Sequence, residues 1–148
     1  MQANFSEASN PPEGVLNIIS FDVHNTLYKN GKLDKRLYGI FKKLHEMCEN
    51  QEIDVDEVCI LTKGDEGVMT LALIDAGMEP CHYVGSKDGL KNETILIAID
   101  DMRPESQGFK AVQHFLPNEV TLEKIFGALG LNSDGSRPTS SAPQDPAP

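Results

Sequence analysis

The sequence lacks any apolar run long enough to cross a membrane, and it is poor in positive charge. Its apolar runs have the length of β-strands, whereas a membrane-spanning helix needs about 20 apolar residues. Thirteen lysines and arginines stand against 23 aspartates and glutamates, which gives a formal net charge of −10. This balance disfavours a broad electrostatic grip on nucleic acid or on an anionic membrane. We therefore expect no membrane partner, and nucleic acid is a less favoured partner than protein.

Cysteine is also scarce. Cys48, Cys59 and Cys81 are odd in number and lack the spacing of a metal-binding cluster. Small buried thiols without partners are typical of a reducing compartment. The N-terminal segment has neither a basic start nor an apolar core, so no signal peptide is predicted. We expect a cytoplasmic protein with buried, unpaired cysteines.

The two ends of the chain lack apolar periodicity. Residues 1–13 are polar and include Pro11-Pro12, and residues 133–148 are rich in serine and proline. Segments of this composition cannot bury enough apolar surface to fold, so both are predicted to be disordered. The length of 148 residues suits one core. Residues 14–132 are then one domain, expected to be a monomer or a weak dimer.

Strand-like and helix-like patterns alternate along this domain. Strands are predicted at 15–22, 58–62, 81–84, 94–100 and 113–116. Helices are predicted after an N-cap at Asp34, at 66–76, at about 104–112, and from an N-cap at Asn118 to Gly130. The helix at 66–76 is apolar nearly all round and should be covered on most sides. The alternation predicts an α/β fold, a three-layer Rossmann-like parallel sheet of about five strands.

Carboxylates follow two of the apolar strands. Asp22 ends the first strand, Asp100 and Asp101 end the fourth, and Thr62 ends the second. The carboxyl ends of parallel strands meet at one edge of a sheet, where ligands bind. Any single aspartate here is also explained as a turn former or an N-cap. The segment 23–27 contains no glycine, so it is not a Gly-rich phosphate loop.

The set as a whole resembles the haloacid dehalogenase (HAD) superfamily of aspartate-nucleophile phosphohydrolases. The first motif of that family reads Asp-x-Asp-x-Thr after an apolar strand, and the segment 22–26 here reads Asp-Val-His-Asn-Thr. Thr62 matches the second motif, and Asp100-Asp101 match the fourth. The resemblance covers residues 15 to 131 and implies the strand order 5-4-1-2-3. One departure matters, because His24 replaces the second aspartate of the first motif.

The resemblance implies a role for each matched residue. Asp22 would be the nucleophile that forms an aspartyl-phosphate. Mg²⁺ would be held by Asp22, by the main-chain carbonyl of His24 and by Asp101, with Asp100 in support. Thr62 would hydrogen-bond a phosphoryl oxygen.

The third motif requires a lysine, and three lysines are candidates. Lys87 directly follows the third strand at the expected site edge, whereas Lys91 lies just before the fourth strand, at the opposite edge. We therefore choose Lys87. Lys63, next to Thr62, is the reserve, and a surface role is an alternative for each.

The presence of histidine at position 24 is compatible with two predicted functions. An imidazole with a pKa near 6.5 can donate and accept the proton that the second aspartate normally handles. The first function is a Mg²⁺-dependent phosphatase without a cap domain, acting on a large or exposed phosphorylated substrate such as a phosphoprotein. The alternative is a catalytically degenerate HAD-like protein that acts as a binding or regulatory module. A receiver domain is disfavoured, because its acidic pair would follow the first strand rather than the fourth.

Overall fold

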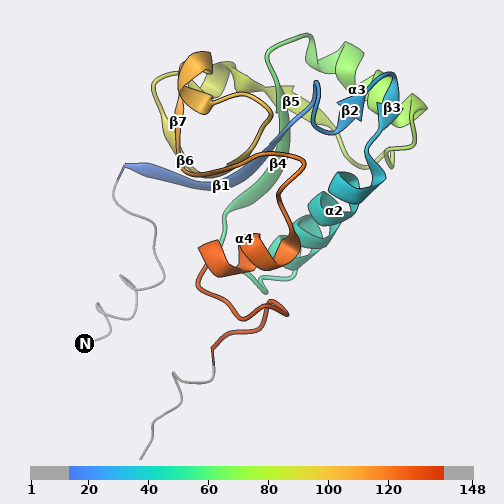
Figure 1. Cartoon of the computed structure of the whole chain (residues 1–148). Helices are drawn as coiled ribbons and strands as arrows, with labels where there is room; N and C mark the ends of the chain where they lie inside the picture. Colours follow the sequence, from blue (N-terminus) through green and yellow to red (C-terminus); the bar gives the residue numbers. More distant parts are fainter. Residues whose placement is uncertain (1–13, 139–148) are drawn as a thin grey trace, which may run out of the picture.

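The computed structural model describes residues 14–138 (Figure 1). The predicted disordered segment 1–13 and residues 139–148 of the predicted tail lie outside the described residues. In chain order the elements are β1 (Val15–Asp22), β2 (Tyr28–Lys29), β3 (Lys32–Leu33), α2 (Lys35–Glu49), β4 (Glu57–Thr62), α3 (Glu66–Asp75), β5 (Val84–Ser86), the 3-10 helix η1 (Lys87–Leu90), β6 (Thr94–Ile99), the 3-10 helix η2 (Pro104–Gln107), β7 (Lys110–Phe115) and α4 (Leu122–Ala128).

Five of the strands form one sheet in the order β5-β4-β1-β6-β7. Every neighbouring pair in it is parallel. The predicted parallel, Rossmann-like α/β sheet of five strands is confirmed, and the strand order is the expected one. Because β1 is central, Asp22 at its carboxyl end has neighbours on both sides, with Leu61 of β4 in register beside it.

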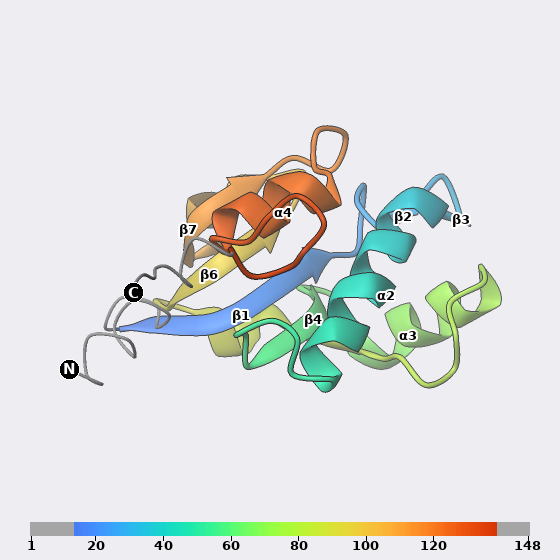
Figure 2. The same cartoon turned by 90° about the horizontal axis from the view of Figure 1, so that it is seen from below.

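Two apolar clusters cover the two faces of this sheet. The larger cluster joins inward-facing residues of β1, β4 and β6 to α2, α3 and α4. Figures 1 and 2 show α2 and α4 on the same side of the sheet. The smaller cluster consists of Leu61, Leu90, Ile95, Ala98 and Phe109, with Leu90 contributed by η1. The second covering layer is therefore built from short 3-10 helices and loops rather than α-helices.

Helix α2 begins after Asp34 as predicted, and a short hairpin precedes it. The side chain of Asp34 accepts a hydrogen bond from Leu37 N (3.0 Å) and caps α2. Asn30 and Gly31 have φ values of 52° and 72°, the left-handed conformation that a tight β2–β3 turn requires. Only this hairpin separates β1 from α2.

Two predictions for the second half of the chain are wrong. The third strand begins at Val84 rather than at residue 81, because His82 N bonds to Glu79 O (3.0 Å) and closes a turn there. The helix predicted at 104–112 is only the 3-10 helix η2. Gly108 follows it with φ 90°, which turns the chain, and residues from Lys110 then pair with β6.

The exposure of α3 and the start of α4 also differ from expectation. Val68 and Leu71 of α3 are 61% and 69% exposed, so this apolar helix is covered on one side only. The N-cap of α4 is Thr121, which accepts from Lys124 N (3.1 Å), and not Asn118. No helix within residues 14–138 is long and apolar enough to span a membrane.

The three cysteines are free, as expected, but they are not buried. Cys48 and Cys59 are half-buried, and Cys81 is exposed. Cys81 lies in the turn before β5, where the sequence prediction had placed a strand. Its thiol is therefore accessible to ligands from solvent.

The described start of the predicted C-terminal tail forms a turn. Gly135 N bonds to Asn132 O (2.9 Å), and Asn132 N bonds to Ser136 O (2.9 Å). Gly135 is buried with φ 88°, and a Cβ at this position would lie 3.0 Å from Phe126 Cζ and 3.1 Å from Met47 Cε. Gly135 therefore packs against Phe126 of α4 and Met47 of α2, while its neighbours Asp134 and Ser136 are exposed.

Gly135→Ala is expected to destabilise the protein more than Gly130→Ala. Both glycines have positive φ, which costs a side chain about 1–2 kcal/mol. A Cβ at Gly130 has nothing within 4 Å, whereas at Gly135 it adds overpacking of about 1–3 kcal/mol. Urea unfolding of both variants measures the difference, and equal losses would show that the 132–136 turn does not pack.

Candidate functional site

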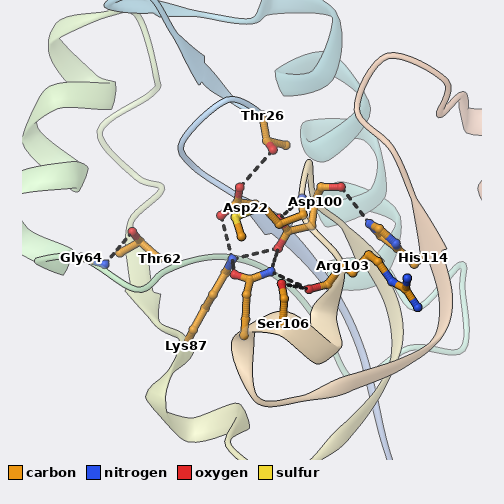
Figure 3. Close-up of polar contacts among 11 residues, drawn as sticks. Asp22, Thr26, Thr62, Gly64, Lys87, Asp100, Arg103, Ser106 and His114 are labelled. Atoms are coloured by element: carbon orange, nitrogen blue, oxygen red, sulfur yellow. Dashed lines mark hydrogen bonds and ion pairs between the residues drawn. The ribbon is translucent and has the colours of Figure 1, made fainter.

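The carboxyl edge of the sheet gathers side chains from several elements. Asp22 ends β1, Thr62 ends β4, and Asp100 follows β6 directly. Lys87 opens η1, immediately after β5. Figure 3 shows Asp22, Lys87 and Asp100 pointing toward one another. The parallel topology thus brings together residues that are far apart in the sequence.

The ammonium group of Lys87 is the centre of this cluster. Lys87 Nζ lies 2.7 Å from Asp22 Oδ1 and 2.8 Å from Asp100 Oδ2. All three residues are buried, with exposed fractions of 5%, 7% and 2% respectively. Of the three candidate lysines, Lys87 is the one brought to Asp22, while Lys63 and Lys91 are exposed.

Gln107 is a member of the site that sequence reasoning missed. Its Oε1 accepts from Lys87 Nζ (2.6 Å), and its Nε2 donates to Asp100 Oδ2 (3.0 Å). Gln107 is the last residue of η2, in the segment that had been predicted as a longer helix. A short 3-10 turn leaves no periodic signal, so the sequence offered no means of finding this residue.

Further hydrogen bonds orient the two buried aspartates. Thr26 Oγ1 donates to Asp22 Oδ2 (3.1 Å). Met102 N donates to Asp100 Oδ1 (3.0 Å), and His114 Nε2 donates to the Asp100 carbonyl (2.8 Å). Every carboxylate oxygen of Asp22 and Asp100 thus has a donor, which fixes both side chains.

The carboxylates are also arranged so that they could hold a cation. Oxygen atoms of Asp22, Asp100 and Asp101 all lie within 4.8 Å of one another. With Lys87, these four side chains carry a net charge of −2 when ionised, from three negative groups and one positive group. An oxygen-only ligand set with excess negative charge fits Mg²⁺.

The remaining predicted residues, His24 and Thr62, differ in exposure. His24 is exposed. Two backbone hydrogen bonds connect this segment to Tyr28: Tyr28 N donates to Val23 O, and Asn25 N donates to Tyr28 O. The His24 carbonyl takes part in neither of them. Thr62 is buried, and its Oγ1 accepts from Gly64 N (3.0 Å). Thr62 follows Leu61, which is in register with Asp22, and Figure 3 shows its hydrogen bond with Gly64.

The pKa of Asp22 is raised from its ordinary value to about 7. Burial is the main cause, because it disfavours the charged form, and the nearby charge of Asp100 raises the pKa further. The ion pair with Lys87 acts in the opposite direction but does not cancel these effects. Near neutral pH, Asp22 is therefore poised between its protonated and ionised forms.

No family model, curated protein or solved structure matches the chain.

The stability of the metal-free protein is expected to fall as pH rises from about 4 to about 7. The folded state holds the Asp22 proton in this range, whereas the unfolded chain releases it near pH 3.8. The free energy of unfolding should fall by about 1.4 kcal/mol for each pH unit between the pKa of the unfolded chain and that of the folded protein. The total loss is then a few kcal/mol at most.

Denaturant unfolding in the presence of a chelator measures this dependence. Asp22→Asn should flatten the pH profile, and Asp75→Asn, an exposed aspartate of α3, should leave it unchanged. A profile that is the same in wild type and Asp22→Asn would show that Asp22 titrates normally.

Proposed function

We propose that this protein is a Mg²⁺-dependent phosphohydrolase that acts through an aspartyl-phosphate on Asp22. The observation that supports this most strongly is the buried contact of Lys87 with both Asp22 and Asp100, with Asp101 close enough to share a cation. A nucleophilic carboxylate, a cation site and a fixed ammonium group are the components that phosphoryl transfer needs.

Each residue then has a distinct task. The Asp22 carboxylate attacks phosphorus, and the leaving oxygen departs with a proton from His24. Lys87 and Thr62 stabilise negative charge on the peripheral phosphoryl oxygens. Asp22, Asp101 and the His24 carbonyl would hold Mg²⁺, which supplies further neutralisation of that charge, and Asp100 would orient Lys87.

The second half of the reaction regenerates the enzyme. A water molecule attacks the aspartyl-phosphate, the bond between Asp22 and phosphorus breaks, and inorganic phosphate leaves. His24 accepts the proton of this water and is ready for the next cycle. Its exposed position, two residues after Asp22, supports exchange of this proton with solvent.

The proposal includes a HAD-like domain without a cap. The short links beside the site support it, because residues 23–34 contain only the β2–β3 hairpin and residues 87–93 only η1. A domain with only these short links beside the site suits a large or exposed phosphorylated substrate, of which a phosphoprotein is the class we favour. The acidic net charge makes nucleic acid a poorer fit.

A degenerate binding or regulatory module is the second candidate, and one observation favours it. Lys87 holds Asp22 in a closed, buried ion pair, and Thr26 occupies the second oxygen of the same carboxylate. A nucleophile engaged at both oxygens must release a partner before it can attack. Together with the replacement of the usual acid by His24, this arrangement also suits a site that binds without turnover.

Hydrolysis of p-nitrophenyl phosphate distinguishes the two candidates. The wild type should release nitrophenol with Mg²⁺ and lose most of that rate with a chelator, because the phosphoryl charge is then poorly neutralised. Asp22→Asn should be inactive under both conditions, since it has no carboxylate to attack phosphorus. Background rates in all four samples would reject the enzyme and favour the binding module.

Replacing His24 by aspartate tests the role of the altered position. His24→Asp should raise turnover of an alkyl phosphate by up to about 10²–10⁴ fold, the usual range for general acid–base catalysis. The gain should be smaller for an aryl phosphate, whose leaving group needs little protonation. His24→Asn is the matched control, because asparagine has the size of aspartate but no titratable group. This variant should be slower than wild type. If His24→Asp and His24→Asn behave alike, position 24 takes no part in proton transfer.

A further inference from the structure

A second group of metal-ligating side chains lies outside the carboxylate cluster. Glu79, Cys81 and His82 belong to the turn between α3 and β5, and one ligand atom from each lies within 4.8 Å of the others. We propose that these three residues form a binding site for a zinc-class ion, distinct from the Mg²⁺ site. Carboxylate, thiolate and imidazole are the three ligand types that Zn²⁺ takes in proteins.

The thiol and the carboxylate already face each other. Cys81 Sγ donates to Glu79 Oε1 across 3.8 Å, while Lys42 Nζ holds the other oxygen, Oε2, at 3.0 Å. An ion bound between Sγ and Oε1 replaces the thiol proton, which leaves to solvent. Binding thus converts one thiol into a metal thiolate and releases one proton, with no change in oxidation state.

The imidazole is held in place by the core. Tyr38 Oη lies 2.7 Å from His82 Nδ1 and also accepts from Glu79 N (2.9 Å), so one hydroxyl fixes two members of the site. The His82 ring packs edge-on against Phe41. When Nε2 of His82 coordinates an ion, Nδ1–H can donate to Tyr38, which is the supporting contact that metal-bound histidines usually have.

A cavity next to Cys81 and His82 gives an ion access to these side chains and has room for a fourth ligand. It has a volume of about 550 Å³ and is lined by His45, Cys81 and His82, among other residues. The ring centroids of His45 and His82 are 5.1 Å apart. Water from this cavity, or His45 itself, can complete a tetrahedral shell.

The two sites should select different ions. Sulfur and nitrogen ligands favour Zn²⁺ or Co²⁺, whereas the oxygen-only cluster around Asp22 and Asp101 favours Mg²⁺. The odd number and spacing of the cysteines argue against a cluster of several cysteine ligands. They do not argue against this site, which uses one cysteine together with a glutamate and a histidine.

Titration of the purified full-length protein with Co²⁺ tests the proposal, because cobalt bound to a thiolate has a charge-transfer band in the near ultraviolet. The wild type should develop this band together with the visible bands of a tetrahedral ion, and Zn²⁺ should displace Co²⁺ and abolish both. An excess of Mg²⁺ should change neither. Absence of the charge-transfer band in wild type overturns the proposal.

The variants separate this site from the others. Cys81→Ser and Glu79→Gln change exposed residues, and the first should abolish the charge-transfer band while the second weakens cobalt binding. Cys48→Ser is the matched control, because Cys48 lines the same cavity but donates to Val55 O (3.3 Å). It should bind Co²⁺ like wild type. A band that survives Cys81→Ser would place the ion elsewhere and reject the site.

Two further variants test the support and the independence of the site. Tyr38→Phe keeps the ring but removes the contact with Nδ1, and should weaken cobalt affinity about 10–100 fold. Asp22→Asn should leave the cobalt spectrum and affinity unchanged. If Asp22→Asn abolishes binding, the ion occupies the carboxylate cluster and the proposal fails, whatever the outcome of the phosphatase assay.

Discussion

The buried contact of Lys87 with Asp22 and Asp100 is the constraint on which the carboxyl edge of the sheet depends. Charged groups removed from water are costly unless each finds a partner. Here one ammonium group satisfies carboxylates at the ends of two neighbouring strands, β1 and β6. Loss of one member of such a cluster typically costs about 3–5 kcal/mol, because the others remain buried without compensation. The ends of these strands and the start of η1 are thereby held at one point.

The 3-10 helices η1 and η2 on the second face of the sheet position the side chains that contact Asp22 and Asp100. Leu90 in η1 and Phe109 just after η2 belong to the smaller apolar cluster. The same two 3-10 helices carry Lys87 and Gln107, at the first and last positions of η1 and η2 respectively. Packing of these segments on the sheet therefore delivers the polar side chains to Asp22.

The charge of this cluster connects its structure to its proposed chemistry. Lys87 contacts two of the three carboxylates, Asp22 and Asp100. The pKa of Asp22 rises to about 7 because burial and the charge of Asp100 both oppose its ionisation. A divalent cation would relieve that opposition and leave Asp22 ionised as a nucleophile requires. Lys87 and Thr26 occupy the Asp22 oxygens, and under either proposed function one of these contacts would have to open before Asp22 could react. The two candidate functions therefore differ in how readily one carboxylate can be released.

The sequence alone determined the parts of this protein that depend on local patterns. Apolar runs ending at Asp22, Thr62 and Asp100 marked three strands of the parallel sheet, and Asp34 marked the N-cap of α2. These features follow from neighbouring residues, so they can be read without a structure.

Only the tertiary structure decided the features that depend on distant contacts. The helix predicted after Pro104 became a short 3-10 turn and a strand, since pairing with β6 prevailed over local helical preference. Gln107, and the placement of Glu79, Cys81 and His82 beside Tyr38, had no sequence signal. Their positions are set by packing between segments remote in the chain, and periodicity within one segment carries no information about such packing.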